Sequence, residues 1–400
     1  MQLDGQHFDL IIVGSGLAGN CLALALQASD LKIGIIEANT KEQLHQSAMG
    51  DRALALAAGT IATLEELGVW QGIQAKATAI TDIHVSDKGH FGKVRLSAHK
   101  HNVAALGYVI TARDIESHVA ALVDNTTITQ LCPARLLGLM SDDKAVNVSI
   151  KHKDNSLCIT AQLLVGADGG NSTVRKLLDI PQQVTEYKQT ALVTTVKTTL
   201  PHRNIAYERF TQSGPLALLP TGKNLCSVVW ARSTGGADTL MAGNEDDFLQ
   251  ALQLCFGYRL GQLSLAAPRR AFPVSLIRAE RMQTDRAVII GNAAHQLHPV
   301  AGQGFNLGLR DVVELADRLL KQHGSGEDIG ASNFLDNYVK SRERDHRNTI
   351  AFTDTLVKLF SNDWLALATG RNIGLAVLDH VPAAKALLAR HAMGLAQRLS

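Results

Sequence analysis

The sequence predicts an α/β protein in which a Rossmann-like nucleotide-binding domain carries an inserted, mostly antiparallel β domain and is followed by a helical C-terminus. The chain opens with a strand, a glycine-rich turn and a helix, the order in which such a domain begins. Two later apolar strands, Leu163–Ala167 and Ala287–Ile290, also end in glycine-rich turns. Between Val184 and Pro273 the chain is rich in Thr and Val, which is typical of β-strands. The nucleotide-binding domain is therefore expected to be discontinuous in sequence.

The first forty residues predict a βαβ unit. A strand is expected over Phe8–Val13, a helix over Leu17–Ala28 and a second strand over Leu31–Glu37, with a right-handed crossover between parallel strands. The uncharged run Leu10–Ser29 is long enough to cross a bilayer. Because it breaks at three glycines and contains Asn20, a strand, a turn and a buried helix explain it better than a membrane span.

The next part of the chain predicts a second layer and then a return to the first sheet. The Ala- and Leu-rich segment Arg52–Leu67 is expected to be helical, as is Ala112–Val123. A hairpin is expected where Ile80–Ser86 and Lys93–Leu96 flank a Gly-His-Phe-Gly turn. Further strands are expected near Ile128, at 145–150 and 156–159, and at Leu163–Ala167.

The inserted domain and the C-terminal part complete the expected architecture. Strands are expected at 190–199, 205–210, 215–220 and 225–232, with a helix over Glu245–Phe256. After the strand at 287–290, a glycine-rich loop leads through Gly304 into a helix over Phe305–Lys321, and helices are expected over 331–359 and 372–399. The resulting division is a nucleotide-binding domain at 1–79, 100–182 and 274–360, a substrate domain at 80–99 and 183–273, and a helical tail at 361–400.

Composition excludes several classes of protein. The 400 residues carry 39 Lys and Arg against 37 Asp and Glu, so no overall positive field is available to hold a nucleic-acid backbone and no nucleic-acid partner is expected. The five cysteines are scattered, odd in number and without a C-x-x-C pair, which indicates a reducing compartment. The first basic residue is Lys32, unlike a secretory signal or a transit peptide. A cytoplasmic protein is therefore expected.

The run G-S-G-L-A-G at 14–19 joins the first strand to the first helix. Gly14, Gly16 and Gly19 permit the tight turn and let backbone N–H groups approach a pyrophosphate at the positive end of the helix. Glu37, at the end of the second strand, is placed to accept a hydrogen bond from a ribose 2′-hydroxyl and to disfavour a 2′-phosphate. The fingerprint alone does not distinguish FAD from NAD.

Two further segments identify the family. Residues 164–175 read L-V-G-A-D-G-G-N-S-T-V-R, an apolar strand that leads through a carboxylate and a glycine turn into a short helix. Residues 285–295 read D-R-A-V-I-I-G-N-A-A-H and continue through His298, Pro299 and the run G-Q-G-F-N at 302–306 into a helix. With the first fingerprint and Asp51-Arg52, these motifs resemble the FAD-dependent aromatic hydroxylases of the para-hydroxybenzoate hydroxylase fold. The resemblance covers nearly the whole chain and implies a GR2-type FAD-binding domain.

Within that family the chain is similar to the ubiquinone-biosynthesis hydroxylases. The similarity is strongest to members that act on 2-octaprenyl-6-methoxyphenol. Sister members share the cofactor motifs and differ mainly in the substrate domain, so the ring position that is hydroxylated stays open. The matching segments are Asp51–Gly59, E-R-F-T-Q at 208–212, Gly214–Pro220, Gly291–Asp311 and G-R-N-I-G-L at 370–375.

The resemblance implies an activity and its participants. FAD would be tightly bound, NAD(P)H would act as a transient reductant, and O2 would be used through a flavin hydroperoxide to hydroxylate the ring of a polyprenylated phenol. It also implies membership of a ubiquinone-biosynthesis complex. A reductase that inserts no oxygen and an FAD-stabilised scaffold without turnover are the alternatives, and the absence of a W-x-W pair disfavours a flavin halogenase.

The resemblance also assigns cofactor contacts. Arg52 would contact the flavin nucleotide through its fork of donors, the alternative being a surface arginine beside a helix-capping Asp51. Asp168 and Gly169 would border the cofactor groove, with Arg175 nearby as a phosphate partner, and Asp168 can also cap the following helix. The full set of expected cofactor residues is Gly14, Gly16, Gly19, Glu37, Arg52, Asp168, Gly169, Gly291, Asn292, Pro299, Gly302 and Gly304.

The segment around residue 292 departs from the family pattern. Family members usually read G-D-A-A-H where this chain has Asn292, so an amide replaces the carboxylate expected to bind the ribityl chain, and a neutral group gives a weaker hydrogen bond. His295 and His298 are spaced H-x-x-H, but without a visible third ligand no metal site is expected. No catalytic base is identified, since Tyr108, Tyr207 and His298 are each better explained as structural.

The tail carries a local positive charge. Residues 371–400 hold four Lys or Arg against one Asp. A basic, apolar helical segment suits peripheral contact with an anionic inner-membrane surface or with a partner helix, and it equally suits a helix that packs on the nucleotide-binding domain.

Overall fold

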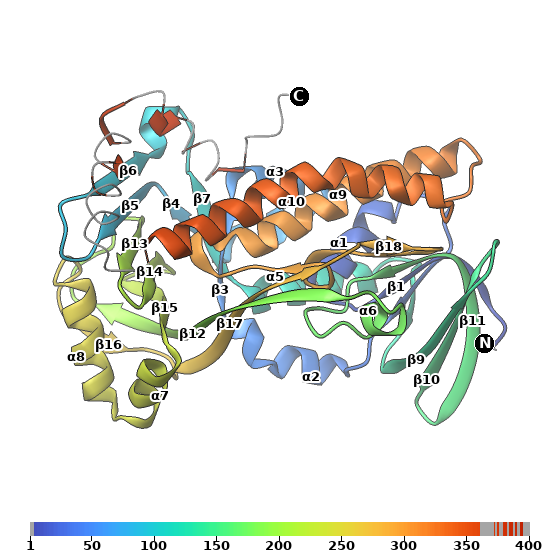
Figure 1. Cartoon of the computed structure of the whole chain (residues 1–400), viewed down its shortest axis with the longest axis horizontal. Helices are drawn as coiled ribbons and strands as arrows, with labels where there is room; N and C mark the ends of the chain where they lie inside the picture. Colours follow the sequence, from blue (N-terminus) through green and yellow to red (C-terminus); the bar gives the residue numbers. More distant parts are fainter. Residues whose placement is uncertain are drawn as a thin grey trace.

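The computed structural model describes residues 4–360 and, beyond them, residues 372, 374, 375, 379–381, 384–386, 389, 393 and 394. Two large sheets lie toward opposite ends of an elongated molecule, and helices α9 (Gln303–Gly324) and α10 (Ser332–Phe360) run side by side along one of its long sides (Figure 1). The expected α/β class with a second, mostly antiparallel sheet is confirmed. The expected tail helix 372–399 lies largely outside the described residues.

The first sheet has β1 (His7–Val13) at its centre. It pairs in parallel with β2 (Ile33–Ile36) on one side and with β11 (Asn155–Gly166) on the other. These strands are apolar on both faces because helices cover them; every residue from Leu10 to Val13 is buried. The outer members are β8 (Thr129–Leu131), β9 (Ala134–Ser141), β10 (Val146–His152), β18 (Gln283–Thr284) and β19 (Ala287–Ile289).

Helices pack on the first sheet and connect its strands. The helix α1 (Leu17–Leu26) is apolar nearly all round and lies between the sheet, α9 and α5 (Ala112–Asp124). The expected helices at 112–123, 305–321 and 331–359 are confirmed to within a few residues. Shorter helices are α2 (Lys41–Gln46), α3 (Ala58–Glu66), α4 (Trp70–Ile73) and α6 (Thr173–Leu177).

Among the described residues the second sheet has nine strands, and only the β13–β5 pair of these is parallel. Its apolar outer face packs on α7 (Thr234–Ala242) and α8 (Glu245–Phe256), where Trp230 meets Phe248. The strands are β5 (Asp82–Asp87), β6 (Lys93–Ser97), β12 (Gln182–Thr198), β13 (Ile205–Thr211), β14 (Gly214–Pro220), β15 (Leu225–Ser233), β16 (Leu263–Leu265), β17 (Arg270–Ala279) and β20 (His295–Gln296).

A small third sheet corrects one expectation. Residues 52–67 do not form one helix: β3 (Ala53–Ala57) pairs antiparallel with β7 (Gly107–Thr111), and the helix begins only at Ala58. β4 (Thr78–Ile80) completes the sheet. An Ala-Leu run suits a helix locally, but here backbone pairing with β7 decides the conformation, as tertiary context commonly does.

Other boundaries also differ from the sequence expectation. The strands expected at 156–159 and 163–167 are one strand, β11, and the strand expected from 190 begins at Gln182 in β12. β9, β17 and α7 were not expected. The sequences of these three elements lack a strong periodic pattern. Their conformation is therefore determined by the elements they pair with or pack against, rather than by local sequence.

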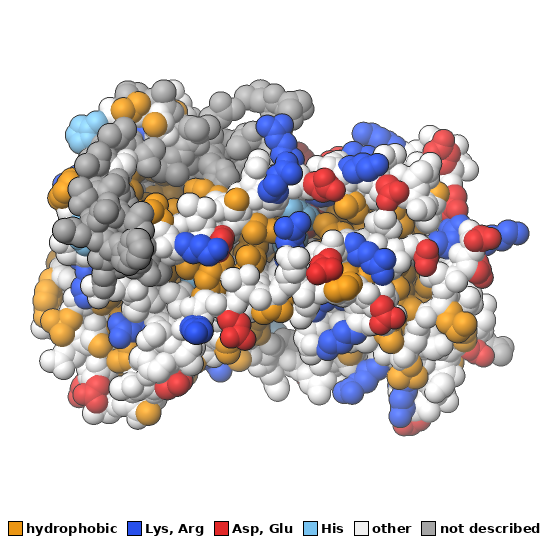
Figure 2. Space-filling view, in the orientation of Figure 1, with side chains coloured by type: hydrophobic (Ala, Val, Ile, Leu, Met, Phe, Trp, Pro, Cys, Tyr) orange, Lys and Arg blue, Asp and Glu red, His pale blue; other side chains and the backbone are white. Residues whose placement is uncertain are grey.

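The surface of the described part carries mixed charge. On the face shown in Figure 2, basic and acidic side chains are interspersed rather than gathered into one patch. No helix among the described residues is long and apolar enough to span a membrane.

Candidate active site

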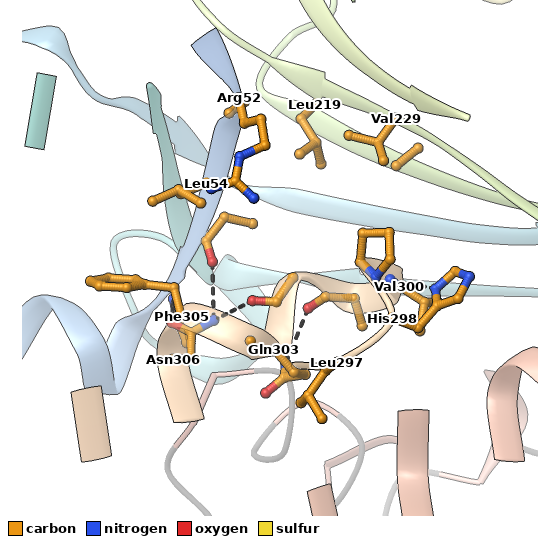
Figure 3. A pocket seen from close by; sticks show the side chains of 18 of the residues that line it. Arg52, Leu54, Leu219, Val229, Leu297, His298, Val300, Gln303, Phe305 and Asn306 are labelled. Carbon is orange, nitrogen blue, oxygen red and sulfur yellow. Dashed lines mark hydrogen bonds between the residues drawn. The ribbon is translucent and has the colours of Figure 1, made fainter. Parts of the chain in front are cut away.

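A cavity of about 1020 Å³ lies where the two large sheets, β3 and the start of α9 meet. Figure 3 shows Arg52 beside β3, Leu219 and Val229 of the second sheet, and the loop that carries His298 and Val300. The cavity has two ends of different character. One is formed by glycine-rich turns at the carboxyl ends of the parallel strands, the usual ligand site of such sheets, and the other by aliphatic side chains of the second sheet.

The first glycine-rich turn leaves the start of α1 open to the cavity. Gly14 has φ +103°, and a Cβ on it would lie 2.6 Å from the Ala167 carbonyl oxygen. Gly16, by contrast, faces open space, and no side chain caps α1. Because the first N–H groups of a helix attract anions when uncapped, this end fits a pyrophosphate. Gly16, Leu17 and Ala18 line the cavity.

Glu37 lies behind this turn and holds it in place. One carboxylate oxygen accepts hydrogen bonds from the Ser15 backbone N–H at 2.9 Å and hydroxyl at 3.0 Å, and the other accepts from the Asn39 N–H at 2.8 Å and amide at 3.0 Å. These four donors fill the roughly four acceptor positions of a carboxylate, and Glu37 does not line the cavity, so its role here is to hold the turn. The contact with ribose stays a prediction.

The second turn follows β11. The Asp168 carboxylate accepts from the Thr173 N–H at 2.6 Å and the Val174 N–H at 3.0 Å, so it binds the first N–H groups of α6, although the N-cap residue itself is Ser172. Gly169, with φ +81°, lines the cavity. Arg175 is not free to bind a phosphate as expected: its guanidinium donates to the carbonyls of Ala293 at 2.7 Å and Gly170 at 2.8 Å.

Arg52 projects into the cavity from the residue before β3 (Figure 3). Its Nε donates to the Met49 carbonyl at 3.0 Å. Burial lowers the pKa of its guanidinium, and the charge of Glu116, which also lines the cavity, opposes that change. The alternative of a surface arginine beside a helix-capping Asp51 does not hold, because Asp51 pairs with Arg113 at 2.6 Å and Arg270 at 2.8 Å.

The third turn precedes α9 and supplies most of the remaining expected cofactor residues. Ala301 and Gly302 both have left-handed backbone angles, with φ +56° and +61°, so the chain bends sharply before α9 begins. α9 starts without a side-chain cap, which again leaves N–H groups directed at the cavity. The cavity-lining members of this turn are Gly291, Asn292, Pro299, Gly302 and Gly304, and the Asn292 side chain is exposed.

Asn306 joins this turn to the third sheet, a role the sequence did not indicate. Its amide nitrogen donates to the carbonyls of Ala55 at 3.1 Å and Gly302 at 2.8 Å, and its oxygen accepts from the Ala57 N–H at 3.1 Å and the Thr60 hydroxyl at 2.6 Å. Figure 3 shows Asn306 at the base of the cavity. One buried side chain thus satisfies four groups and fixes the loop against β3.

The two histidines of the H-x-x-H pattern point to different partners. His298 lines the cavity; its Nδ1 accepts from the Val300 N–H at 3.0 Å, so Nε2 carries the proton and donates to Gln189 at 3.1 Å. Burial lowers the pKa of His298 to about 4. His298 is therefore neutral at neutral pH and held in place by these two hydrogen bonds.

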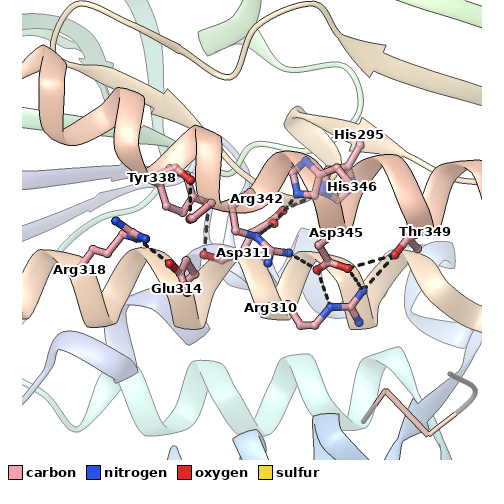
Figure 4. A network of polar contacts seen from close by, with 11 residues as sticks. His295, Arg310, Asp311, Glu314, Arg318, Tyr338, Arg342, Asp345, His346 and Thr349 are labelled. Atoms are coloured by element: carbon pink, nitrogen blue, oxygen red, sulfur yellow. Dashed lines mark hydrogen bonds and ion pairs between the residues drawn. The ribbon is translucent and has the colours of Figure 1, made fainter. Parts of the chain in front are cut away.

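His295 instead joins a buried polar network between α9 and α10 (Figure 4). Asp311 accepts at one oxygen from His295 Nε2 at 2.7 Å, and at the other from His346 Nε2 at 2.6 Å and Arg342 Nε at 2.8 Å. A third group near His295 therefore exists, contrary to the sequence reasoning. Its carboxylate oxygens are already occupied by these donors, however, and a guanidinium beside a cation would repel it.

Two carboxylates and two guanidinium groups in this network carry opposite charges that cancel. Asp345 accepts from Arg342 and from Arg310 Nε at 2.8 Å. The neighbouring imidazoles and their hydrogen bonds hold the pKa of Asp311 well below its usual range despite burial. His295 follows Asn292 in the third turn. The network therefore anchors the third turn to α10.

The apolar end of the cavity contains one carboxylate that the sequence reasoning missed. Glu208 on β13 lines the cavity among aliphatic side chains, and burial raises the pKa of its carboxyl to about 7. Its alternation with Ala206 and Phe210 was visible in sequence, but which face of the strand would enclose a cavity was not.

Known proteins with similar sequences and folds are numerous. Residues 7–353 match the family described as FAD binding domain. The chain is 34% identical to the ubiquinone hydroxylase UbiL of Rhodospirillum rubrum over 96% of this chain and 89% of that protein. It is 29% identical to the 3-demethoxyubiquinol 3-hydroxylase of Escherichia coli over 98% of this chain and 100% of that protein. Its fold matches p-nitrophenol 4-monooxygenase PnpA of Pseudomonas putida with a TM-score of 0.80 at 16% identity, over 98% of this chain and 100% of that chain.

Proposed function

The chain belongs to the ubiquinone-hydroxylase family of FAD-dependent monooxygenases, and from this premise we propose that it hydroxylates the aromatic ring of a polyprenylated phenol, 2-octaprenyl-6-methoxyphenol, with NAD(P)H and O2. The observation that carries the proposal is the continuity of the cavity. The same cavity is bordered by the glycine-rich turns that fit a dinucleotide and by a broad aliphatic wall. A ring with an isoprenoid tail requires that combination, since its apolar area must leave water to bind.

The residues around the turns fit FAD. The uncapped start of α1 suits its pyrophosphate, and the uncapped start of α9 suits negative charge on the reduced ring. Bound FAD supplies the two-electron chemistry with O2. Gly14, Gly19, Glu37 and Asp168 shape the turns from behind, whereas the other proposed cofactor residues line the cavity.

The chain's own contribution is orientation and exclusion of water. Val300 of the third turn packs in one cluster with Phe210 of the second sheet and with Val357 and Phe360 of α10. This cluster closes the cavity beside the turn and brings the aliphatic wall next to the proposed flavin position. A ring bound against that wall is thereby held near the cofactor and away from solvent.

The choice of ring position is the finer part of the proposal. The E. coli relative is a 3-demethoxyubiquinol 3-hydroxylase, so a sister activity at another position is the competing assignment. It predicts the same cofactor and a different product. Membership of a biosynthetic complex and peripheral contact with the inner membrane stay predictions.

Product analysis tests the proposal. Purified protein with FAD and NAD(P)H is incubated under ¹⁸O₂ with prenylated 2-methoxyphenol and, separately, with an analogue that represents the sister activity, a prenylated 3-demethoxyubiquinol. A single labelled oxygen on the methoxyphenol supports the proposed substrate, and fragmentation gives the ring position. Label only in the analogue assigns the sister activity. NAD(P)H consumption without labelled product from either substrate contradicts oxygen insertion and favours a reductase.

A further inference from the structure

Glu208 lies in the middle of a row of side chains that crosses the second sheet. Backbone pairing places it opposite Val85 of β5 and Ala217 of β14. The same row continues outward, and every member lines the cavity. In order across the sheet the row is Val94, Val85, Glu208, Ala217, Val229 and Val193.

Nothing in the described structure compensates this carboxylate. Among the described residues, no hydrogen bond or ion pair to it is seen, and its neighbours in the row are Val and Ala. Tyr207 precedes it and packs its ring against His84 and Phe256, toward the outer face. An ionised carboxylate in such surroundings lowers the stability of the fold, because it loses water and gains no hydrogen bond or ion pair in exchange. This suggests that its partner is a ligand.

Other ionisable groups do not explain its state. Those that line the same cavity are Arg52, Glu116, Tyr207 and His298. On the neighbouring strands, Asp87 accepts from Asn372 and does not line the cavity, while Lys93 and Arg95 flank Val94 and are exposed. Burial alone raises the pKa of the Glu208 carboxyl, to about 7. A base with a pKa near the working pH is the kind that transfers protons efficiently.

The carboxylate also lies near the turn assigned to the flavin. Phe210, two residues along the same face of β13, and Val94, in the same row, both pack in the cluster that contains Val300. The same cluster therefore joins the strand that carries Glu208 to the turn assigned to the flavin.

We propose that the Glu208 carboxylate accepts the hydroxyl proton of the phenol bound in the cavity; this deepens the proposed function and rests on it. The phenol O–H bond breaks, an O–H bond forms on a carboxylate oxygen, and the electron pair remains on the phenolate. No electron is lost or gained in this step. The phenolate makes the ring a better nucleophile toward an electrophilic oxygen, and Glu208 later returns the proton to water.

The test compares three variants of the FAD-bound enzyme. Glu208→Gln keeps the shape and removes the base, Glu208→Asp keeps a carboxylate, and Glu280→Gln removes an exposed carboxylate from the end of β17. For each we measure bound FAD, flavin reduction by NAD(P)H, and hydroxylated product per NAD(P)H as the pH is varied through 7. We expect Glu208→Gln to form product about 10²-fold more slowly while it binds and reduces FAD normally.

The pH dependence of product formation shows whether Glu208 acts as a base or only packs in the cavity wall. Product formation by the wild type and by Glu280→Gln should fall as the pH decreases through about 7, because the base becomes protonated. Glu208→Asp should keep a titration of this kind at a reduced rate, and Glu208→Gln should lose it. A Glu208→Gln variant with the wild-type yield and profile would overturn the proposal, as would a Glu208→Asp variant with the flat profile of Glu208→Gln.

A binding experiment keeps this test independent of turnover. A nitro-substituted 2-methoxyphenol absorbs at different wavelengths as phenol and as phenolate. At neutral pH we expect more bound phenolate in the wild type than in Glu208→Gln, and an equal fraction in both contradicts proton transfer to Glu208. If the wild type makes no labelled product, the proposed function fails, while this comparison still decides the role of Glu208.

Discussion

Two carboxylates in this chain, the fully buried Asp311 and the partly buried Glu208 of the cavity wall, have opposite surroundings. Asp311, between α9 and α10, receives hydrogen bonds from two imidazoles and a guanidinium, and its pKa lies well below the usual range. Glu208, on the cavity wall, has aliphatic neighbours, and burial raises the pKa of its carboxyl to about 7. Donors replace the lost water for the first carboxylate and not for the second.

The difference indicates what each region is for. The pKa of the Asp311 carboxyl lies well below its usual range, so this carboxylate stays ionised and joins the third turn to α9 and α10, which serves the architecture of the proposed cofactor site. Glu208 lies in a row of apolar side chains and can change its protonation state inside a cavity that a ligand can enter. Titratable groups with shifted pKa values are common in functional sites. The same functional group therefore anchors one region and is available for proton transfer in the other.

Removal of the Asp311 charge should have the largest effect. Asp311→Asn removes one of the two carboxylates that pair with the buried Arg342 and the charged acceptor of two imidazoles, which we expect to lower the free energy of unfolding by about 3–5 kcal/mol. Urea denaturation of the FAD-bound protein measures this. Asp317→Asn, at an exposed position on the same helix, should change stability little.

The pH dependence of that effect has a definite sign. The folded-state pKa of Asp311 is depressed, so its contribution is present above the unfolded pKa and is lost as the pH falls toward the folded one. The stability gap between wild type and Asp311→Asn should therefore narrow below pH 3.8. A gap that widens in acid would contradict the assignment.

Removal of the Glu208 charge should raise stability, whereas removal of the Asp311 charge should lower it. The folded pKa is raised from 4.5 to about 7, so the ionised group lowers stability by up to about 3 kcal/mol above that pH. This cost is absent below pH 4.5, grows as the pH rises from 4.5 to about 7, and stays constant above the folded pKa. Glu208→Gln should thus be more stable than the wild type in alkaline solution and equal in acid, whereas Glu280→Gln should match the wild type throughout.

Asn306→Ala tests the link between the third turn and the third sheet. It leaves the Ala57 N–H and the Ala55 carbonyl without their partner, which we expect to lower stability by about 1–3 kcal/mol and to weaken FAD binding. Thermal unfolding and a flavin fluorescence titration measure the two effects. Asn125→Ala, at the exposed end of α5, should leave FAD affinity unchanged.

The smallest expected effect is at Asn292. Asn292→Asp provides a charged acceptor for ribityl hydroxyls, and charge-assisted hydrogen bonds are stronger by about 1 kcal/mol, so FAD should bind about fivefold more tightly. The same fluorescence titration at neutral pH measures it. Weaker binding would contradict the position assigned to the flavin.

The sequence predicted the elements whose patterns are local. The strand–turn–helix at 8–28 and the helix at 245–256 follow from periodicity and glycine placement, and the structure confirms them. β3 could not be distinguished from a helix, because an Ala-Leu run has no decisive period and its partner β7 is fifty residues away.

The site was predictable only in part for the same reason. Glycine-rich turns can be identified from the sequence. The unusual surroundings of Glu208 cannot, because the Val and Ala residues around it come from five other strands that only the fold brings together. The Asp311 network had one local signal: Arg342 and His346 stand four residues apart and so share a helix face. Their carboxylate lies on another helix, which no local pattern indicates.

The most direct test of the comparison is infrared difference spectroscopy of the FAD-bound protein as the pH is raised through 7. A protonated carboxyl band should disappear near that pH in the wild type and in Asp317→Asn, and should be missing from Glu208→Gln. A wild-type protein without such a band, or a Glu208→Gln variant that retains it, would contradict the account of Glu208 as the uncompensated carboxylate of the cavity.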